Sequence, residues 1–229
     1  MAAAEKEMAS LSPDTVRWDT NHHVENIAAA LQSRQGGRSV NTQEYDSVLN
    51  GPIVDYSFRQ LDTLSGSLVL TPRTGFRPNQ YTEDKKLMSC SLRLSHNRLS
   101  DLSGLNQLIE NLFVEPNRLF WIDLSFNSFS SIDPILILCR NLQILNLHGN
   151  QILELFEVDK LASLPHLRSL TLHGNPVELM KGYRSYMVGN IPQLKSLDFS
   201  TITKQDRSTA AVMKSFTKQK RIVKRKYDD

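Results

Sequence analysis

The sequence predicts an α/β solenoid in which short parallel strands form a curved inner sheet, with short helices and turns on the outside. Four asparagines close the same frame, in which apolar residues stand eight, five and three positions earlier and two positions later; only Ser89 breaks this rule. The frames are SCSLRLSHNRL, LFWIDLSFNSF, LQILNLHGNQI and LRSLTLHGNPV, ending around Asn97, Asn127, Asn150 and Asn175. Apolar residues two positions apart point to the same side of a short strand. One such repeat cannot bury its own apolar edge, so a series of repeats must stack.

The asparagine of each frame has a structural role at the end of its strand. Its amide can bond to backbone groups that the turn leaves unpaired, and amides of neighbouring repeats can stack into a ladder. This is the frame of a leucine-rich repeat. We therefore predict a leucine-rich repeat solenoid, a curved horseshoe with four repeats over residues 89–180.

Length and composition favour one domain with extensions at both ends. The first ten residues, MAAAEKEMAS, carry charge where a signal peptide needs an apolar stretch. No run approaches the roughly 20 apolar residues of a membrane span. Cys90 and Cys139 lie in or beside repeats rather than in paired caps, which favours a reducing compartment, the cytosol or the nucleus.

The region before the four repeats divides into two segments. Residues 1–50 are polar without a sustained period and are predicted to be a partly disordered N-terminal arm. Residues 51–88 begin with GPIVDYSFRQL, which fits the frame loosely and has Arg59 where asparagine belongs. We interpret it as a degenerate first repeat, followed by an insertion over residues 65–86 that is rich in Thr, Pro and Gly.

The outer surface is predicted to be partly helical. The step of 30 residues between Asn97 and Asn127 leaves room for a full helix, and residues 101–113 place Leu102, Leu105, Leu108 and Leu112 at helical spacing. Residues 132–139 and 154–164 fit shorter helices, the first starting at Asp133 before a proline.

The segment 181–203 carries a second signature, Tyr183-Arg184-x-Tyr186 followed by Ile191-Pro192-x-Leu194-Lys195-x-Leu197-Asp198. With the repeats, it resembles the capped intracellular leucine-rich repeat proteins. That group includes a protein-phosphatase regulatory subunit, the repeat-type axonemal dynein light chain and the leucine-rich spliceosomal subunit. The resemblance implies a last half-repeat from Leu194, Leu197 and Phe199, and a cap in which Tyr183, Tyr186 and Met187 cover the open edge.

The usual catalytic and metal motifs are missing: there is no phosphate loop, Gly-x-Ser-x-Gly, His-Glu-x-x-His or paired Cys-x-x-Cys. His148 and His173 occupy the same position in adjacent repeats, but two ligands are too few for a closed zinc site. Cys139 is expected to be an ordinary buried thiol rather than a nucleophile. We therefore predict no enzyme, no cofactor and no metal.

The concave face is the predicted binding surface, because the third, fifth and seventh positions of each frame point outward from the inner sheet. Most of these residues are small and polar. Trp121 and Ile144 stand side by side and predict an apolar patch, an anchor for a protein partner. The alternative is that the arm or the insertion folds back over them. The predicted contact residues are Trp121, Ile144, Arg93, Asp123, Asn146, His148, His173 and Phe126.

The end of the chain, residues 204–229, is predicted to be a basic helical tail. It holds nine Lys and Arg against three Asp, whereas the rest of the chain has 18 basic and 21 acidic residues. Three interpretations stay open: a solvated helix end, a nuclear import signal, or a clamp on an acidic surface such as tubulin or RNA. RNA is the least favoured because no stacking aromatics accompany the charge. The basic residues are Lys218, Lys220, Arg221, Lys224, Arg225 and Lys226.

We predict a non-enzymatic scaffold that presents its concave face and basic tail to protein partners, without binding a membrane. The resemblance implies a phosphatase regulator, a ribonucleoprotein subunit or an axonemal component, and it favours the last, in the cytoplasm or cilium. A nuclear or ribonucleoprotein subunit that uses the basic tail is the first alternative. A phosphatase-regulatory adaptor is the second alternative function. The third is an enzyme whose cofactor pocket lies under the arm and the insertion.

Overall fold

A computed structural model describes residues 51–65, 70–75 and 78–227, with side chains described up to residue 215. The chain divides into two compact units, residues 1–45 and 46–229, and the described residues all belong to the second. The predicted N-terminal arm lies outside the described residues.

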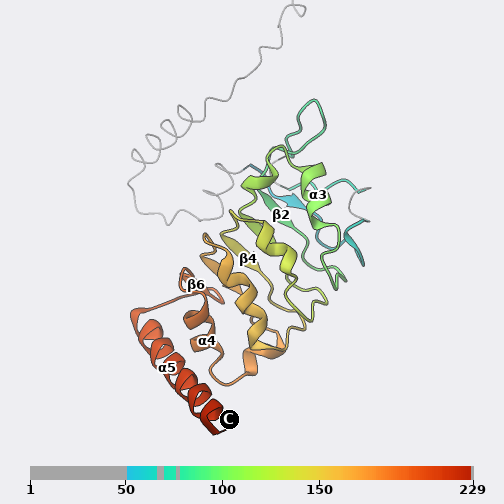
Figure 1. Cartoon of the computed structure of the whole chain (residues 1–229). Helices are drawn as coiled ribbons and strands as arrows, with labels where there is room; N and C mark the ends of the chain where they lie inside the picture. The colour runs from blue at the N-terminus through green and yellow to red at the C-terminus, as the bar shows by residue number, and fades with distance from the viewer. Residues whose placement is uncertain (1–50, 66–69, 76–77, 228–229) are drawn as a thin grey trace, which may run out of the picture. The chain divides into compact units, whose positions relative to one another are not determined.

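Seven short strands form one sheet, in the order in which they occur along the chain. They are β1 (Val54–Asp55), β2 (Ser91–Arg93), β3 (Trp121–Asp123), β4 (Ile144–Asn146), β5 (Ser169–Thr171), β6 (Ser196–Leu197) and β7 (Ser200–Thr201). Neighbours from β1 to β6 pair in parallel, and only β6 and β7 are antiparallel. This arrangement, an open parallel sheet with helices on one side (Figure 1), confirms the predicted fold class.

The outer elements are shorter than an α-helical repeat would require. Between residues 105 and 190, all of which the structure describes, two α-helices, α3 (Leu105–Leu112) and α4 (Tyr183–Asn190), lie among four 3₁₀ helices: η2 (Pro116–Arg118), η3 (Pro134–Leu138), η4 (Leu155–Ser163) and η5 (Pro176–Leu179). The segments 132–139 and 154–164 thus form 3₁₀ helices. A 3₁₀ helix rises about 2.0 Å per residue against 1.5 Å for an α-helix, so it spans the outer side with fewer residues. This suits repeats that advance by only 23 and 25 residues.

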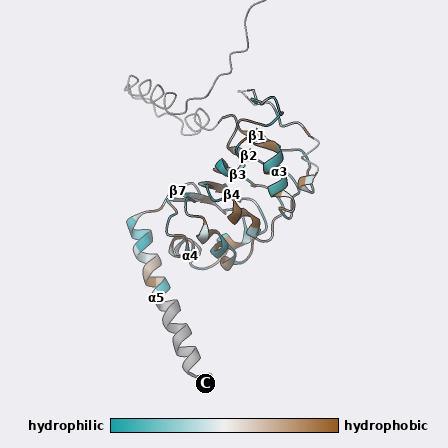
Figure 2. Ribbon diagram, turned by 45° about the horizontal axis from the view of Figure 1, so that its top comes forward, coloured by the Kyte–Doolittle hydropathy of each residue, from teal (hydrophilic) through white to brown (hydrophobic). Residues whose placement is uncertain are grey.

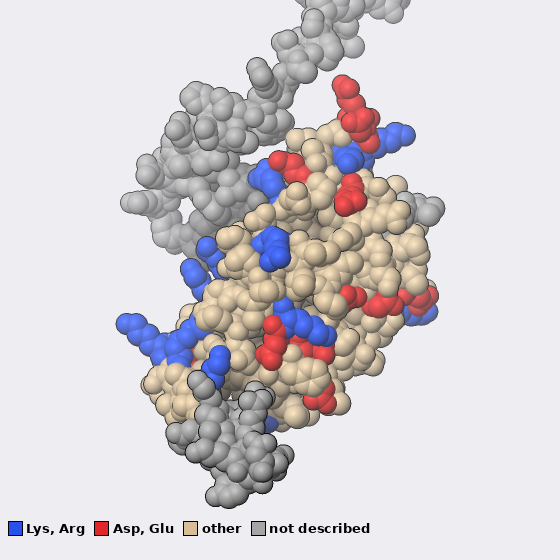
Figure 3. All heavy atoms as spheres, viewed as in Figure 1, with Lys and Arg blue, Asp and Glu red and all other residues tan. Residues whose placement is uncertain are grey.

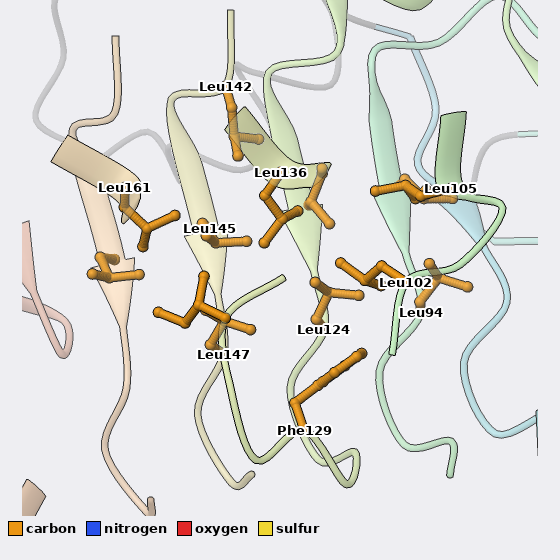
Figure 4. Packing of buried hydrophobic residues seen from close by; sticks show 14 of the residues in the cluster. Leu94, Leu102, Leu105, Leu124, Phe129, Leu136, Leu142, Leu145, Leu147 and Leu161 are labelled. Carbon is orange, nitrogen blue, oxygen red and sulfur yellow. The ribbon is translucent and has the colours of Figure 1, made fainter. Parts of the chain in front are cut away.

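The core is one continuous apolar column between the sheet and the outer elements (Figure 4). Leu94, Leu124, Leu147 and Leu172, which occupy the same position in the four frames, are all buried in it. The register pairs Leu92, Ile122, Leu145 and Leu170 in the same way on successive strands. Each repeat therefore covers the apolar edge of the one before it. Figure 2 accordingly shows hydrophobic segments within the repeat body and hydrophilic ones at the first turn of the C-terminal helix α5 (Lys204–Tyr227).

The asparagine ladder ties each repeat to the preceding one. Asn150 donates from Nδ2 to the carbonyls of Leu147, at 2.9 Å, and of Leu124 in the repeat before, at 3.0 Å. Its Oδ1 accepts the backbone N–H of Phe129, also in the repeat before, at 3.1 Å. Asn97, Asn127 and Asn175 make the equivalent bonds.

The direction of this ladder explains Arg59. Because each asparagine bonds backward, an asparagine at this position would have no earlier strand of the described sheet to hold, since β1 is the first strand of that sheet. The backbone N–H groups of Arg59 and Leu61 are instead accepted by Asn97 Oδ1, at 3.0 and 3.1 Å. An asparagine is therefore unnecessary at this position, and β1 still pairs with β2, with Val54 and Tyr56 buried.

The C-terminal end of the sheet corrects one prediction. Leu194 and Leu197 are buried, but Phe199 is 71% exposed and is not part of the core. Asp198 and Phe199 have positive φ angles of 50° and 60°, which turn the chain from β6 into the antiparallel β7 and move the phenyl ring out of the inward-facing position. Met187 and Tyr183 of α4 are buried behind the sheet, and Tyr186 is partly buried.

The chain ends in the long helix α5 (Lys204–Tyr227), which packs against α4 through the buried Ala210. Arg184 holds the start of α5 with two bonds to Asp206, at 2.8 and 2.9 Å. Hydrogen bonds from the Arg184 guanidinium, with those from Thr203, hold the pKa of the Asp206 carboxyl well below its usual range. Among the described residues, no helix is long and apolar enough to cross a membrane.

Candidate protein-binding face

Trp121 and Ile144 form an apolar pair on the concave side of the sheet. They are register partners on β3 and β4, and both side chains are half-buried rather than enclosed. Phe120, the residue before Trp121, is also half-buried. The structure therefore brings together the two side chains that the sequence singled out as an anchor.

Arg93 and Asp123 form a charged cluster beside Trp121. The Arg93 guanidinium lies 3.6 Å from a carboxylate oxygen of Asp55 and 3.5 Å from one of Asp123. It also lies 5.3 Å from the centre of the Trp121 ring, within the range of a cation–π interaction. Asp123 is only 8% exposed and accepts two bonds from Ser125. Its carboxylate therefore positions Arg93, which in turn supports one face of the tryptophan.

His148 and Asn146 lie in the middle of the face around Thr171. His148 Nδ1 lies 2.8 Å from the Thr171 hydroxyl, which donates to Asn146 at 3.4 Å. This contact buries Thr171 completely, although its position in the frame points to the concave side. Burial, and then the charge that His173 would carry beside it, lower the pKa of His148. We expect the His148 imidazole to be neutral at pH 7.

His173 and Asp198 join the face to the cap. Asp198 accepts the backbone N–H groups of Leu172 and His173, at 2.7 and 2.9 Å, and the hydroxyl of Tyr183 at 2.8 Å. His173 Nδ1 lies 3.4 Å from the same carboxylate. Burial, and then the Asp198 charge, raise the pKa of Tyr183 far above its ordinary value, so this hydroxyl stays a donor. The Asp198 carboxylate thus accepts the N–H of Leu172, which in the earlier repeats is accepted by a backbone carbonyl of the next strand, as the Thr171 carbonyl accepts the N–H of Leu147.

Six rings, which we call the ring column, pack in a row across the repeats at the carboxyl ends of the strands, some stacked and some edge to face. Successive ring centroids are 4.3, 4.4, 5.1, 4.7 and 5.4 Å apart, close to the spacings of interacting aromatic pairs. Phe126 is 47% exposed within it. The members of the ring column, in order, are Phe58, His96, Phe126, His148, His173 and Phe199.

Sequence reasoning found only three members of this column because the rings come from three different frame positions, the last of them that of Phe199. Phe58, His96 and Phe126 stand at the eighth position, where φ is about 55° in each. In the next two repeats this position is Gly149 and Gly174, and the ring comes from the histidine before it. A Cβ on Gly149 would lie 2.6 Å from the Phe126 ring, so glycine leaves the space that this ring fills. The sequence did carry a signal for this column: in the earlier frames the ring stands at the eighth position, and in the later frames glycine takes that position while the ring moves to the seventh.

The remaining candidate groups are Cys139, a possible metal site and the basic tail. Cys139 is half-buried, and burial raises its pKa to about 11. Among the described side chains, no group of three or more His, Cys, Asp or Glu is placed to hold a metal ion. The backbone of the basic tail continues α5, but the side chains from Lys218 to Lys226 lie outside the described residues. The N-terminal arm also lies outside the described residues, so the alternative that it covers Trp121 stays a prediction.

The stacked frames, the asparagine ladder and the open concave sheet define a leucine-rich repeat protein. A leucine-rich repeat family model matches residues 90–226, and the chain belongs to this family. It is 48% identical to leucine-rich repeat-containing protein 51 of Rattus norvegicus over 77% of this chain and 92% of the relative. It is 47% identical to the Homo sapiens protein of that name, over 76% and 92%.

A solved structure with the same architecture is that of the Drosophila melanogaster SNF/U2A' complex. The likeness has a TM-score of 0.51 and 29% identity, and it covers 66% of this chain and 84% of the other. The fold and its family are consistent with a protein-binding scaffold.

Proposed function

We propose that the protein is a non-enzymatic adaptor that binds a protein partner on its concave face, centred on Trp121 and Ile144. The observation that carries the proposal is the half-buried pair itself. A tryptophan braced by Arg93 yet left partly open offers a rigid apolar surface at small entropic cost to a partner. The Drosophila structure is itself that of a complex, which supports a binding role for the same architecture.

Replacement of Trp121 by Ala in the full chain tests the proposal. Loss of a central aromatic anchor weakens binding by about 2 kcal/mol, or about 30-fold. The matched control is Phe156→Ala, which removes an exposed aromatic ring from η4 on the outer side. Proteins captured by proximity labelling should be lost with Trp121→Ala and kept with Phe156→Ala. Equal capture by both variants, with Trp121→Ala lowering only thermal stability, would show that Trp121 is structural.

The assembly that the adaptor joins is a further part of the proposal. Its resemblance to capped intracellular repeat proteins supports a cytoplasmic or ciliary assembly, with the basic tail contacting an acidic surface such as tubulin. The same resemblance supports a phosphatase-regulatory adaptor as a lesser alternative. Proximity labelling in ciliated and non-ciliated cells distinguishes these, because axonemal proteins should be captured only in the first.

A nuclear or ribonucleoprotein-associated subunit is the second candidate, and the net charge of +6 over residues 204–229 favours it. In that case removal of residues 218–229 should move the protein out of the nucleus and abolish salt-sensitive RNA binding. If the truncated protein keeps its location and the full chain binds no RNA, the nuclear or ribonucleoprotein candidate is ruled out and the adaptor function is the one that stands.

A further inference from the structure

Three cations without an acidic partner follow the edge of the sheet at which the strands begin. Arg140, Arg168 and Lys195 are exposed, and within the described part of the chain none of their side chains makes an ion pair or a hydrogen bond. Arg168 and Lys195 hold the same frame position on adjacent repeats, since the Lys195 N–H donates to the Arg168 carbonyl at 2.7 Å. Arg140 lies in the turn that leads into β4. We call these three residues the basic edge.

Charged groups elsewhere on the sheet have partners within the protein and leave no excess of positive charge there. Arg93 lies between two aspartates, and Asp198 is satisfied by Tyr183, His173 and two backbone N–H groups. Figure 3 shows Lys and Arg side chains along the margin over the β6 end of the sheet and the start of α5, where few Asp or Glu are seen. The basic edge is therefore an uncompensated positive charge beside the binding face.

The basic edge adjoins the apolar pair. Ser169, the residue after Arg168, is the register partner of Ile144. Ser196, the residue after Lys195, is in turn the register partner of Ser169. Neighbouring strands lie about 4.8 Å apart, so Arg168 is about one strand spacing and Lys195 about two from the Ile144 strand. The backbone of both cations thus lies within about two strand spacings of the apolar pair.

We propose that the partner of this face is an acidic protein segment that places an apolar side chain on Trp121 and Ile144. Its Asp or Glu residues, roughly 5–15 Å further along, face Arg168 and Lys195. This inference rests on the proposed function and adds the chemistry of the partner. Long-range attraction between such charges speeds encounter and excludes basic segments, while the apolar pair provides most of the contact energy.

The intrinsic fluorescence of Trp121 provides the assay. Trp18 and Trp121 are the two tryptophans of the chain, so Trp18→Phe in the full-length protein leaves Trp121 as the reporter. The probes are three synthetic peptides of equal length, one of Leu, Ala and Glu, one of Leu, Ala and Lys, and one of Ala and Glu alone. The Leu/Glu peptide should bind tightest. The Ala/Glu peptide controls for simple attraction to the basic tail.

Charge reversal locates the contact. Loss of one exposed ion pair lowers affinity about fivefold. The double variant Arg168→Glu with Lys195→Glu should therefore lower the affinity for the Leu/Glu peptide about 25-fold. The matched control is Arg98→Glu with Lys181→Glu, two exposed cations away from this edge with the same change in net charge. The control should keep its affinity, and 0.5 M salt should remove most of the difference.

The outcomes separate this inference from the proposed function. The inference of an acidic partner would be overturned by any of three results. The Leu/Lys or Ala/Glu peptide binds as tightly as the Leu/Glu peptide, the Leu/Glu peptide does not bind, or both double variants lower its affinity equally. If Trp121→Ala still abolishes capture in cells, the adaptor function stands with a partner of another charge. If Trp121→Ala leaves capture unchanged, the adaptor function itself fails.

Discussion

Replacement of Asn150 by Ala should destabilise the protein far more than an exposed asparagine would. The substitution leaves the buried N–H of Phe129 without an acceptor, at a cost of about 1–3 kcal/mol. It also removes hydrogen bonds to the carbonyls of Leu124 and Leu147, worth about 1 kcal/mol each. Both carbonyls keep a bond from a neighbouring asparagine, Leu124 from Asn127 and Leu147 from Asn175, so the total loss should be near 3 kcal/mol.

The assay is urea-induced unfolding followed by circular dichroism, in which the midpoint falls while the slope is unchanged. The control is Asn141→Ala, an exposed asparagine with one bond to the Asn117 carbonyl, which should change stability by no more than about 0.5 kcal/mol. A loss for Asn150→Ala no greater than that of the control would refute the argument that the ladder binds each repeat to the one before.

Three further outcomes are expected. Gly149→Ala should destabilise by about 1–2 kcal/mol more than Gly104→Ala, because both have positive φ but only the first meets a phenyl ring; equal losses would contradict this. Tyr183→Phe should lower stability by about 1 kcal/mol. Because the folded pKa of Tyr183 is raised, its contribution is present below about pH 10 and lost above it, so the variant should lose less stability between pH 9 and 11 in urea titrations. Burial raises the pKa of Cys90, and that of Cys139 to about 11, so iodoacetamide at pH 8 should label both far more slowly in native than in unfolded protein; rapid native labelling of Cys139 would indicate a reactive thiol.

The repeat core could be predicted from the sequence because it depends on local periodicity. The strand and the residue that follows it place the fourth and sixth frame positions inward in every repeat, so Leu145 and Leu147 were identifiable without knowledge of their neighbours. The pairing of Trp121 with Ile144 followed from the same register. These residues are fixed by spacing along the chain.

The state of the outward-facing residues could not be predicted in this way. Thr171 and Asp123 occupy outward positions, but His148 covers the first, and Arg93 and Ser125 enclose the second. Such burial depends on the length and direction of side chains in the adjacent repeats. Phe199 was wrongly placed in the core because the frame contains no information on a turn with two positive φ angles.

The sequence by itself therefore determined the fold class, the repeat register and the inward face, since each depends on an interval of a few residues. The tertiary structure alone decided which outward groups neutralise one another and which stay uncompensated. It also assembled the ring column and the basic edge from residues 20 to 40 positions apart, because side chains on successive repeats meet only after the strands have stacked.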